Sequence, residues 1–187
     1  MAACDEKVCE NHTQNIVGPD MNPDILRGMT GLELLKRVIK GEISHPSMAT
    51  TIPMKLIKAE KGLAEFDTKA DKKYLNPMGT IHGGFAAVVL DSVTGCAVHS
   101  MLEPGDTYGT IDLNVKLLRP LPMETPLKAQ AHVFHCSNRL GVSEGTLKDQ
   151  DGVIYAHATA VCMISRNKQA QLPSWDKMGA PGRFADG

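Results

Sequence analysis

NPMGTIHGGFAAVVLDSVTGCAVHSM, residues 76–101, is the stretch around which the rest of the chain must be organised. An irregular approach leads to Gly83-Gly84, and an apolar run follows whose only charge is Asp91. No polar periodicity marks a solvent-facing side, and a helix that is apolar nearly all round is usually buried. The pattern therefore predicts a long buried helix that starts at the glycine pair and ends near Leu102, before the turn signal Glu-Pro-Gly-Asp.

A membrane span is the alternative interpretation of this run, because its length is close to what a bilayer requires. A charge at the centre of a span costs about 3 kcal/mol on an insertion scale, and Asp91 lies near the middle of the run. We therefore favour a buried helix of a soluble protein and expect no membrane partner.

Strand patterns flank the predicted helix on both sides. Thr51–Glu60 and Leu63–Lys69 precede it and are joined by Lys61-Gly62, a plausible hairpin turn. Four further strands are predicted at Tyr108–Leu118, Pro126–Ser137, Leu140–Lys148 and Val153–Ser165. An antiparallel sheet curled around the helix would bury it on most sides, and a partner subunit is the simplest cover for the remaining side. We predict an α+β fold of this kind.

Three regions are predicted along the chain. Residues 1–45 form a polar, loosely docked arm followed by a helix, which a capping box at Thr30–Glu33 starts and Gly41 ends. Residues 46–166 form the main domain, and residues 167–187 form an irregular tail. The extension helix carries an apolar face, so we expect it to cover part of the main fold and hypothesise that it caps a substrate tunnel.

Composition narrows the class of protein. A net charge of -1 over 187 residues and an aromatic content of 4% argue against a nucleic-acid partner. Five cysteines show neither a disulfide pattern nor zinc-ligand spacing, so no metal is expected. Free thiols in apolar stretches and an acidic, polar start that is unlike a secretory signal indicate a cytoplasmic protein.

Gly83 and Asp91 are candidate partners in chemistry. On one helix they are separated by about 12 Å, so one reacting carbon cannot touch both. Two such helices packed antiparallel across a two-fold axis would place Gly83 of one chain beside Asp91 of the other, which requires a homodimer. Backbone N–H groups at a helix start, with the Asn76 amide, could stabilise an oxyanion, and the carboxylate could act as general base or nucleophile. The arrangement suits hydrolysis of an ester-like carbonyl.

On these residues the chain resembles hot-dog-fold acyl-CoA thioesterases of the PaaI-like branch, from the phenylacetate pathway. The motif is Asn-Pro-Met-Gly-Thr-Ile-His-Gly-Gly at residues 76–84, with Asp91 nine residues after the histidine. The resemblance covers about residues 50–165 and implies a hot-dog fold, in which an antiparallel sheet wraps around the central helix. It also implies a homodimer that assembles further into a homotetramer and needs no cofactor besides the CoA of its substrate.

The resemblance further implies roles for particular residues. Asp91 would be the general base or nucleophile, and the Gly83 N–H would polarise the thioester carbonyl with help from Asn76. His82 would orient the thioester and the leaving group, and the Thr110 hydroxyl would help to hold the attacking water.

Substrate contacts beyond the reacting carbonyl are assigned to three residues. The Gly84 N–H at the helix start is a candidate substrate contact, and Arg119 and Arg139 are the candidates for binding the CoA phosphates.

Two other functions stay open. A hot-dog domain can bind acyl-CoA without hydrolysing it, or hydrate and dehydrate acyl thioesters at the β-carbon. Asp91 favours hydrolysis over mere binding, and the usual hydratase signature is absent. Each residue also has a structural interpretation: Asp91 as a capped interface acid, Asn76 as a turn residue, Arg119 and Arg139 as surface charges.

Overall fold

The computed structural model describes residues 28–167, so the start of the predicted arm and all of the predicted tail 167–187 except Asn167 lie outside the described residues. The helices are α2 (Gly31–Lys40), α3 (Ser47–Thr51) and α4 (Gly83–His99), with a short 3-10 helix, η2 (Lys72–Tyr74). The strands are β1 (Met54–Glu60), β2 (Leu63–Thr68), β3 (Thr107–Leu117), β4 (Leu127–Cys136), β5 (Leu140–Lys148) and β6 (Ile154–Ser165).

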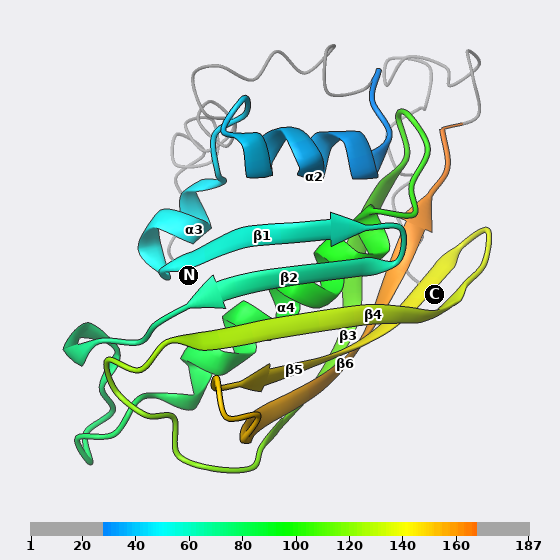
Figure 1. Ribbon diagram of the computed structural model, residues 1–187. Helices are drawn as coiled ribbons and strands as arrows, with labels where there is room; N and C mark the ends of the chain where they lie inside the picture. Colours follow the sequence, from blue (N-terminus) through cyan, green and yellow to red (C-terminus); the bar gives the residue numbers. More distant parts are fainter. Residues whose placement is uncertain (1–27, 168–187) are drawn as a thin grey trace, which may run out of the picture.

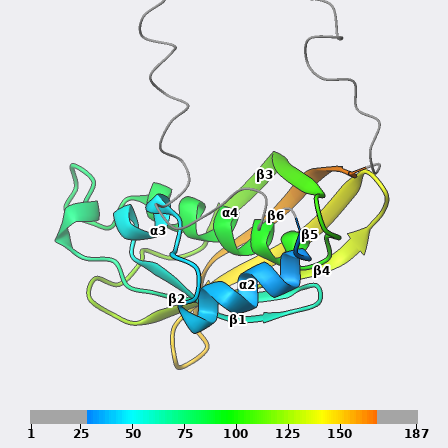
Figure 2. The ribbon, with the colours of Figure 1, turned by 90° about the horizontal axis from the view of Figure 1, so that it is seen from above.

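The six strands form one antiparallel sheet in the order β1-β2-β4-β5-β6-β3, and the sheet curls around α4 (Figure 1). Viewed from above, α4 runs between α2 on one side and β3 on the other (Figure 2). The predicted α+β arrangement of a sheet wrapped around a long central helix is confirmed. β3 closes the sheet at one edge, where it pairs only with β6 among the described strands.

The buried side chains of α4 explain why it lies at the centre. Val89, Leu90 and Val93 are fully buried and join Leu147 of β5 in the main core. The helix ends at His99, three residues before the predicted end near Leu102. Just after its last turn, the Ser100 hydroxyl donates to the Ala97 carbonyl at 2.6 Å. A stripe of half-buried residues remains on the side that the sheet leaves open, and it consists of Gly84, Ala87, Val88, Asp91 and Ser92.

The start of the first predicted strand was wrong. Residues 47–51 form α3, and β1 begins at Met54 rather than at Thr51. Proline explains the boundaries: Pro46 takes the N-cap position with φ -62°, and Pro53 favours an extended residue before it, which ends the helix at Thr51.

The extension helix α2 forms as its capping signals predict. The Thr30 side chain accepts from the Glu33 N–H at 3.2 Å, the Glu33 carboxylate accepts from the Thr30 N–H at 2.9 Å, and Gly41 ends the helix with φ 75°. Leu35 and Val38 are buried against the main core, so α2 does cover the fold.

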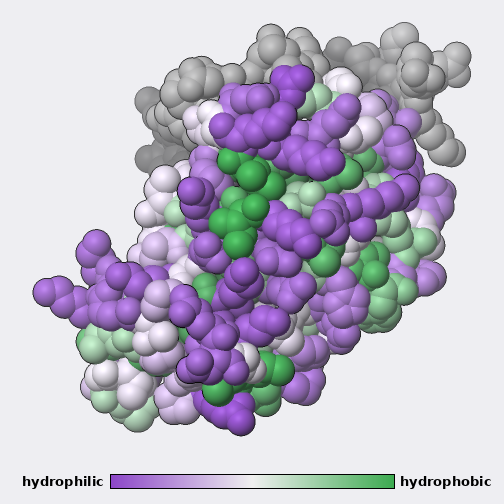
Figure 3. Space-filling view, viewed as in Figure 1, coloured by the Kyte–Doolittle hydropathy of each residue, from purple (hydrophilic) through white to green (hydrophobic). Residues whose placement is uncertain are grey.

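The outer face of the sheet is polar. Hydrophilic side chains dominate the view over β1, β2 and β4 (Figure 3). Within residues 28–167 no helix has the length and hydrophobicity needed to cross a membrane. Three cysteines of this range, Cys96, Cys136 and Cys162, are free thiols.

Candidate functional site

Asp91 and Thr110 meet across α4 and β3. The Thr110 hydroxyl donates a 3.0 Å hydrogen bond to Oδ1 of Asp91. Asp91 lies on the open stripe of α4 and is half-buried, whereas its neighbours Leu90 and Val93 are fully buried. The structure thus brings two of the predicted site residues together and leaves the second carboxylate oxygen, Oδ2, without a hydrogen-bond donor among the described residues.

The start of α4 forms the second part of the site. His82 is the N-cap, and its Nδ1 accepts from the Gly84 N–H at 2.8 Å. An imidazole whose Nδ1 accepts carries its proton on Nε2 when neutral. The Gly84 N–H, which was predicted to contact the substrate, is therefore already hydrogen-bonded to His82. The Gly83 N–H has no acceptor among residues 28–167 and is the amide available to a ligand.

The side chain of Leu117 on β3 approaches the backbone at Gly83 closely. A Cβ added to Gly83 would overlap Cδ1 of Leu117, so a side chain there would displace the Leu117 side chain. β3 therefore contacts α4 at two places: Leu117 lies against the helix start, and Thr110 lies against Asp91.

Asn76 builds the loop before the helix. Its Oδ1 accepts from the N–H groups of Met78 at 3.0 Å and Thr80 at 3.2 Å, and its Nδ2 donates to the Thr80 hydroxyl at 2.8 Å. One Nδ2 proton remains beyond this bond, since an amide carries two. The Asn76 side chain thus shapes the turn and retains one donor for a ligand.

The two predicted CoA-binding arginines lie at opposite ends of the sheet. Arg119 follows the end of β3, and its guanidinium donates to the Ile154 carbonyl. Arg139 lies in the β4–β5 turn, where its carbonyl accepts from Ile164, the residue that pairs with Tyr108 at the start of β3. Within one chain the two arginines therefore cannot contact the same phosphate.

Two residues beside the Asp91–Thr110 pair were missed by the sequence analysis. Tyr108 lies two residues before Thr110 on β3, and a Cβ added to Gly95 would be 2.9 Å from its hydroxyl oxygen, so this face of the strand points at α4. The Cys162 thiol lies 4.0 Å from the Thr110 hydroxyl. Strand alternation places Tyr108 on the face of Thr110, and this was the available signal.

Burial controls the ionisation of the groups around Asp91. Burial first, and the charge of Asp91 second, raise the pKa of the Cys96 thiol to about 12. Burial also raises the pKa of the Tyr108 phenol and lowers the pKa of His99. These three side chains are therefore neutral at pH 7, which leaves the Asp91 carboxylate in neutral surroundings.

Metal-binding groups are not assembled in the described part of the chain. No cluster of three His, Cys, Asp or Glu side chains with the geometry of metal ligands occurs in residues 28–167. His132 and His157 both approach Glu144, with Nε2 to carboxylate distances of 3.3 and 3.4 Å.

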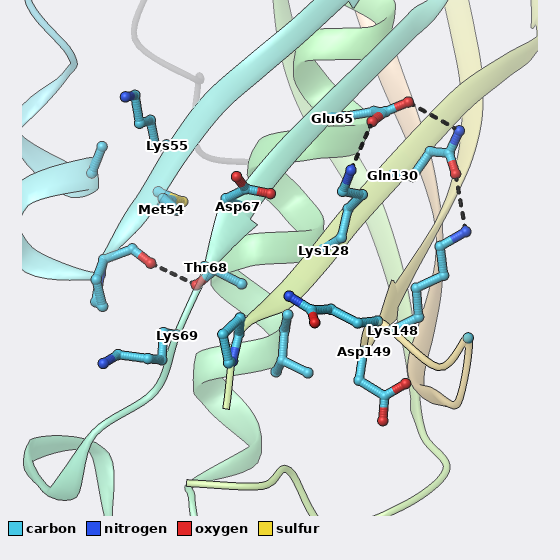
Figure 4. Close-up of a pocket in the computed structure, with 16 residues that line it drawn as sticks. Met54, Lys55, Glu65, Asp67, Thr68, Lys69, Lys128, Gln130, Lys148 and Asp149 are labelled. Atoms are coloured by element: carbon cyan, nitrogen blue, oxygen red, sulfur yellow. Dashed lines mark hydrogen bonds and ion pairs between the residues drawn. The ribbon is translucent and has the colours of Figure 1, made fainter. Parts of the chain in front are cut away.

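A hollow of about 1090 Å³ lies on the outer face of the sheet, and Asp91 is not among the residues that line it (Figure 4). Three of its charged side chains are linked through one amide: Glu65 lies 3.6 Å from Lys128 and accepts from Gln130, which accepts from Lys148 at 3.3 Å. Glu65, Lys128 and Gln130 alternate with buried residues of β2 and β4, so they point away from α4. This hollow is separate from the candidate site.

Comparison with known proteins identifies the family. Residues 78–156 match the model of the thioesterase superfamily. The phenylacetic acid degradation-related protein of Ralstonia eutropha JMP134, a solved structure, is 33% identical, with a TM-score of 0.63 over 69% of this chain and 98% of that chain. The chain belongs to the thioesterase superfamily. Human acyl-coenzyme A thioesterase 13 is 24% identical over 111 residues, which are 59% of this chain and 70% of the human protein.

Other solved structures share the fold at lower identity. The Escherichia coli PaaI protein has a TM-score of 0.63 at 19% identity, over 71% of this chain and 94% of that chain. A Streptococcus mutans protein bound to acetyl CoA has a TM-score of 0.56 at 22% identity, over 60% of this chain and 89% of that chain. These likenesses, with that to the Ralstonia protein, confirm the predicted hot-dog fold.

Proposed function

We propose that this member of the thioesterase superfamily hydrolyses acyl-CoA to a free acid and CoA. The observation that carries the proposal is the Asp91 carboxylate, which lies on the open side of an otherwise apolar helix and is oriented by the Thr110 hydroxyl. A half-buried carboxylate without a counter-charge is costly, and such acids cluster at functional sites; an acid oriented by a hydrogen bond suits the activation of water for acyl transfer.

In the proposed reaction, Asp91 takes a proton from water as the water oxygen attacks the thioester carbonyl carbon. The carbonyl oxygen becomes negative and is stabilised by the Gly83 N–H and the remaining Asn76 amide proton. The carbon–sulfur bond then breaks, and the departing CoA thiolate recovers the proton. His82 caps the helix start through Nδ1, and its Nε2–H group orients the leaving group. Direct attack by Asp91 through an anhydride is the variant of this mechanism that the same geometry allows.

The active unit of this mechanism is a homodimer. One edge of β3 has no strand partner among the described residues, and Ile111, Leu117 and Leu118 on or next to β3 are more than half exposed. An apolar edge strand of this length is a natural site for pairing with another copy. If two copies of β3 pair antiparallel about a centre between Leu113 and Asn114, Leu117 lies across from the partner's Thr110. Gly83, which packs on Leu117, then comes to the partner's Asp91.

The same pairing explains the placement of the arginines. Arg119 follows β3 at its Leu117 end, and Arg139 lies at the Tyr108 end. In the antiparallel pair these ends meet, so Arg119 and the partner's Arg139 approach the same entrance. We assign both to the CoA phosphates.

Release of CoA from acetyl-, medium-chain, long-chain and phenylacetyl-CoA tests the proposal. Asp91→Asn should lower kcat about 10²- to 10⁴-fold, the usual contribution of a general base. Asp67→Asn is the matched control, because Asp67 is an exposed aspartate on the outer face of β2. Unchanged turnover in Asp91→Asn would refute the assignment of Asp91. Tight acyl-CoA binding without any turnover would indicate a non-enzymatic acyl-CoA-binding protein.

A further inference from the structure

An apolar cavity lies beside the candidate active site, between α2 and α4. Its volume is about 320 Å³, at the lower end of the range for ligand pockets. Side chains from six elements line it, among them Leu35 and Val38 of α2, Met54 of β1, Phe66 of β2, Cys96 of α4 and Tyr108 of β3. The extension helix therefore forms one wall of a cavity whose opposite wall is the central helix.

The cavity follows α4 toward its end. Ser92, the residue after Asp91, lines it, as do Cys96 and His99, whereas Asp91 itself is not among the lining residues. On the opposite side Tyr108 lines it, two residues from Thr110, which binds Asp91. From Asp91 to the level of His99 the helix rises about 12 Å. An acyl group whose thioester carbonyl sits at Asp91 can thus extend directly into this space.

The lining is mainly apolar, and its titratable side chains are His45, Cys96, His99 and Tyr108. Among the described residues that line the cavity there is no Asp, Glu, Lys or Arg. Burial keeps the Cys96 thiol protonated, since its pKa is raised to about 12, and lowers the pKa of His99. A charged group at the far end of an acyl chain would therefore be buried without a counter-charge, which is costly. The chemistry of the walls suits a hydrocarbon chain.

We infer that the cavity between α2 and α4 holds the acyl chain of the substrate and selects an unbranched aliphatic group of about eight to ten carbons, as an extended chain advances about 1.2 Å per bond. This inference rests on the proposed acyl-CoA thioesterase function and adds its substrate class. It gives α2 and α3 a direct role, because they supply the wall that limits chain length.

Binding of S-alkyl-CoA thioethers, which cannot be hydrolysed, tests the inference by calorimetry. For the wild-type protein the affinity should rise about fourfold per added methylene. The rise should stop at about ten carbons, the length set by the helical rise to His99. In Cys96→Phe, whose larger side chain fills the cavity about 7.5 Å from Asp91, the rise should stop at about six carbons.

A second pair of variants keeps the test independent of the folding of Cys96→Phe. Met48 lines the cavity and Met123 does not, yet both are 50% exposed. Met48→Trp should weaken binding of the decyl thioether about tenfold or more and spare the methyl thioether, whereas Met123→Trp should bind both as the wild type does.

Three outcomes would overturn the inference. A plateau at the same chain length in the wild type, Cys96→Phe and Met48→Trp, with hydrolysis intact, would refute the cavity and leave the thioesterase function standing. If the affinity for a phenylmethyl thioether already equals the highest affinity reached with alkyl thioethers, the cavity holds an aromatic group and not an aliphatic chain. Absence of both thioether binding and hydrolysis would refute the inference and the proposed function together.

Discussion

Thr110 acts on Asp91 through a single hydrogen bond of 3.0 Å, so its contribution can be measured by itself. Thr110→Val keeps the shape of the side chain and removes the hydroxyl. We predict that kcat falls about 10- to 100-fold, because a hydrogen bond to a charged group is worth about 1.5–3 kcal/mol. Thr110→Ser restores the hydroxyl and should recover most of the activity. Steady-state kinetics on both variants checks this, and equal losses in Val and Ser would show that the methyl group matters and the hydroxyl does not.

Ionisation of the Cys96 thiol lowers the stability of the folded protein at high pH. Its pKa is raised in the folded protein from 9.0 to about 12, so the folded state resists losing the proton that the unfolded state gives up. The stability due to the neutral thiol is therefore complete below about pH 9 and is lost as the pH rises toward 12. At pH 10 the loss from this group should be about 1.4 kcal/mol.

Urea unfolding of the wild type and of Cys96→Ala at pH 8 and pH 10 measures this effect. The variant should lose less stability between the two pH values than the wild type does, whatever its stability at pH 8. Tyr108 and Cys162, whose pKa values are also raised by burial, titrate in both proteins and cancel in the comparison. Equal losses in the two proteins would contradict the burial of the Cys96 thiol.

At the scale of elements, the contact between α2 and the end of α4 depends on Gly31. A Cβ added to Gly31 would lie 1.8 Å from the His99 carbonyl oxygen, and the Gly31 N–H donates to the Leu102 carbonyl at 3.0 Å. Gly31→Ala should therefore push α2 away from α4 and cost about 1–3 kcal/mol, as overpacking does.

Hydrogen exchange separates this local effect from general unfolding. The amides of α2 should exchange faster in Gly31→Ala, while those of α4 and the sheet keep their protection. Because α2 forms one wall of the acyl cavity, the gain in affinity per methylene should also shrink. Unchanged exchange in α2 would show that the helix end accommodates a methyl group.

At the scale of the whole molecule, the prediction concerns assembly. Ile111 on β3 and Met163 on the outer face of β6 are both 57% exposed, so they form a matched pair for a charge substitution. Ile111→Asp should convert the dimer to a monomer and abolish turnover, because each proposed site takes Gly83 and Asp91 from different chains. Its fold should persist, since Ile111 is the bulge residue of an edge strand.

Met163→Asp distinguishes a dimer from the predicted tetramer. It should leave the dimer and its activity intact, and a drop from tetramer to dimer would place the contact between dimers on the outer face of the sheet. Light scattering after size exclusion measures both variants. A fully active Ile111→Asp monomer would refute the shared site.

Much of the candidate site was predictable from local sequence patterns. The unpredicted part depends on contacts between segments that are far apart in the sequence. Asp91 could be found because a charge stands out in an apolar helix, and Thr110 followed from the family resemblance. The hydrogen bonds that commit Asn76 to its loop and Gly84 to the His82 cap were not predictable, since they depend on side-chain geometry. α3 was missed because two prolines, and not an apolar period, set its limits.

The sequence by itself determined that a buried helix carries one acid and that alternating strands must surround it, because burial patterns are local and follow the periods of helix and strand. Only the tertiary structure decided which partners meet. Strand order sets β3 at the edge, sets Thr110 against Asp91, and separates Arg119 from Arg139. The cavity between α2 and α4 also exists only in three dimensions, because six elements form its walls. A hydrophobic period shows that a face is buried but does not specify the surface it packs against.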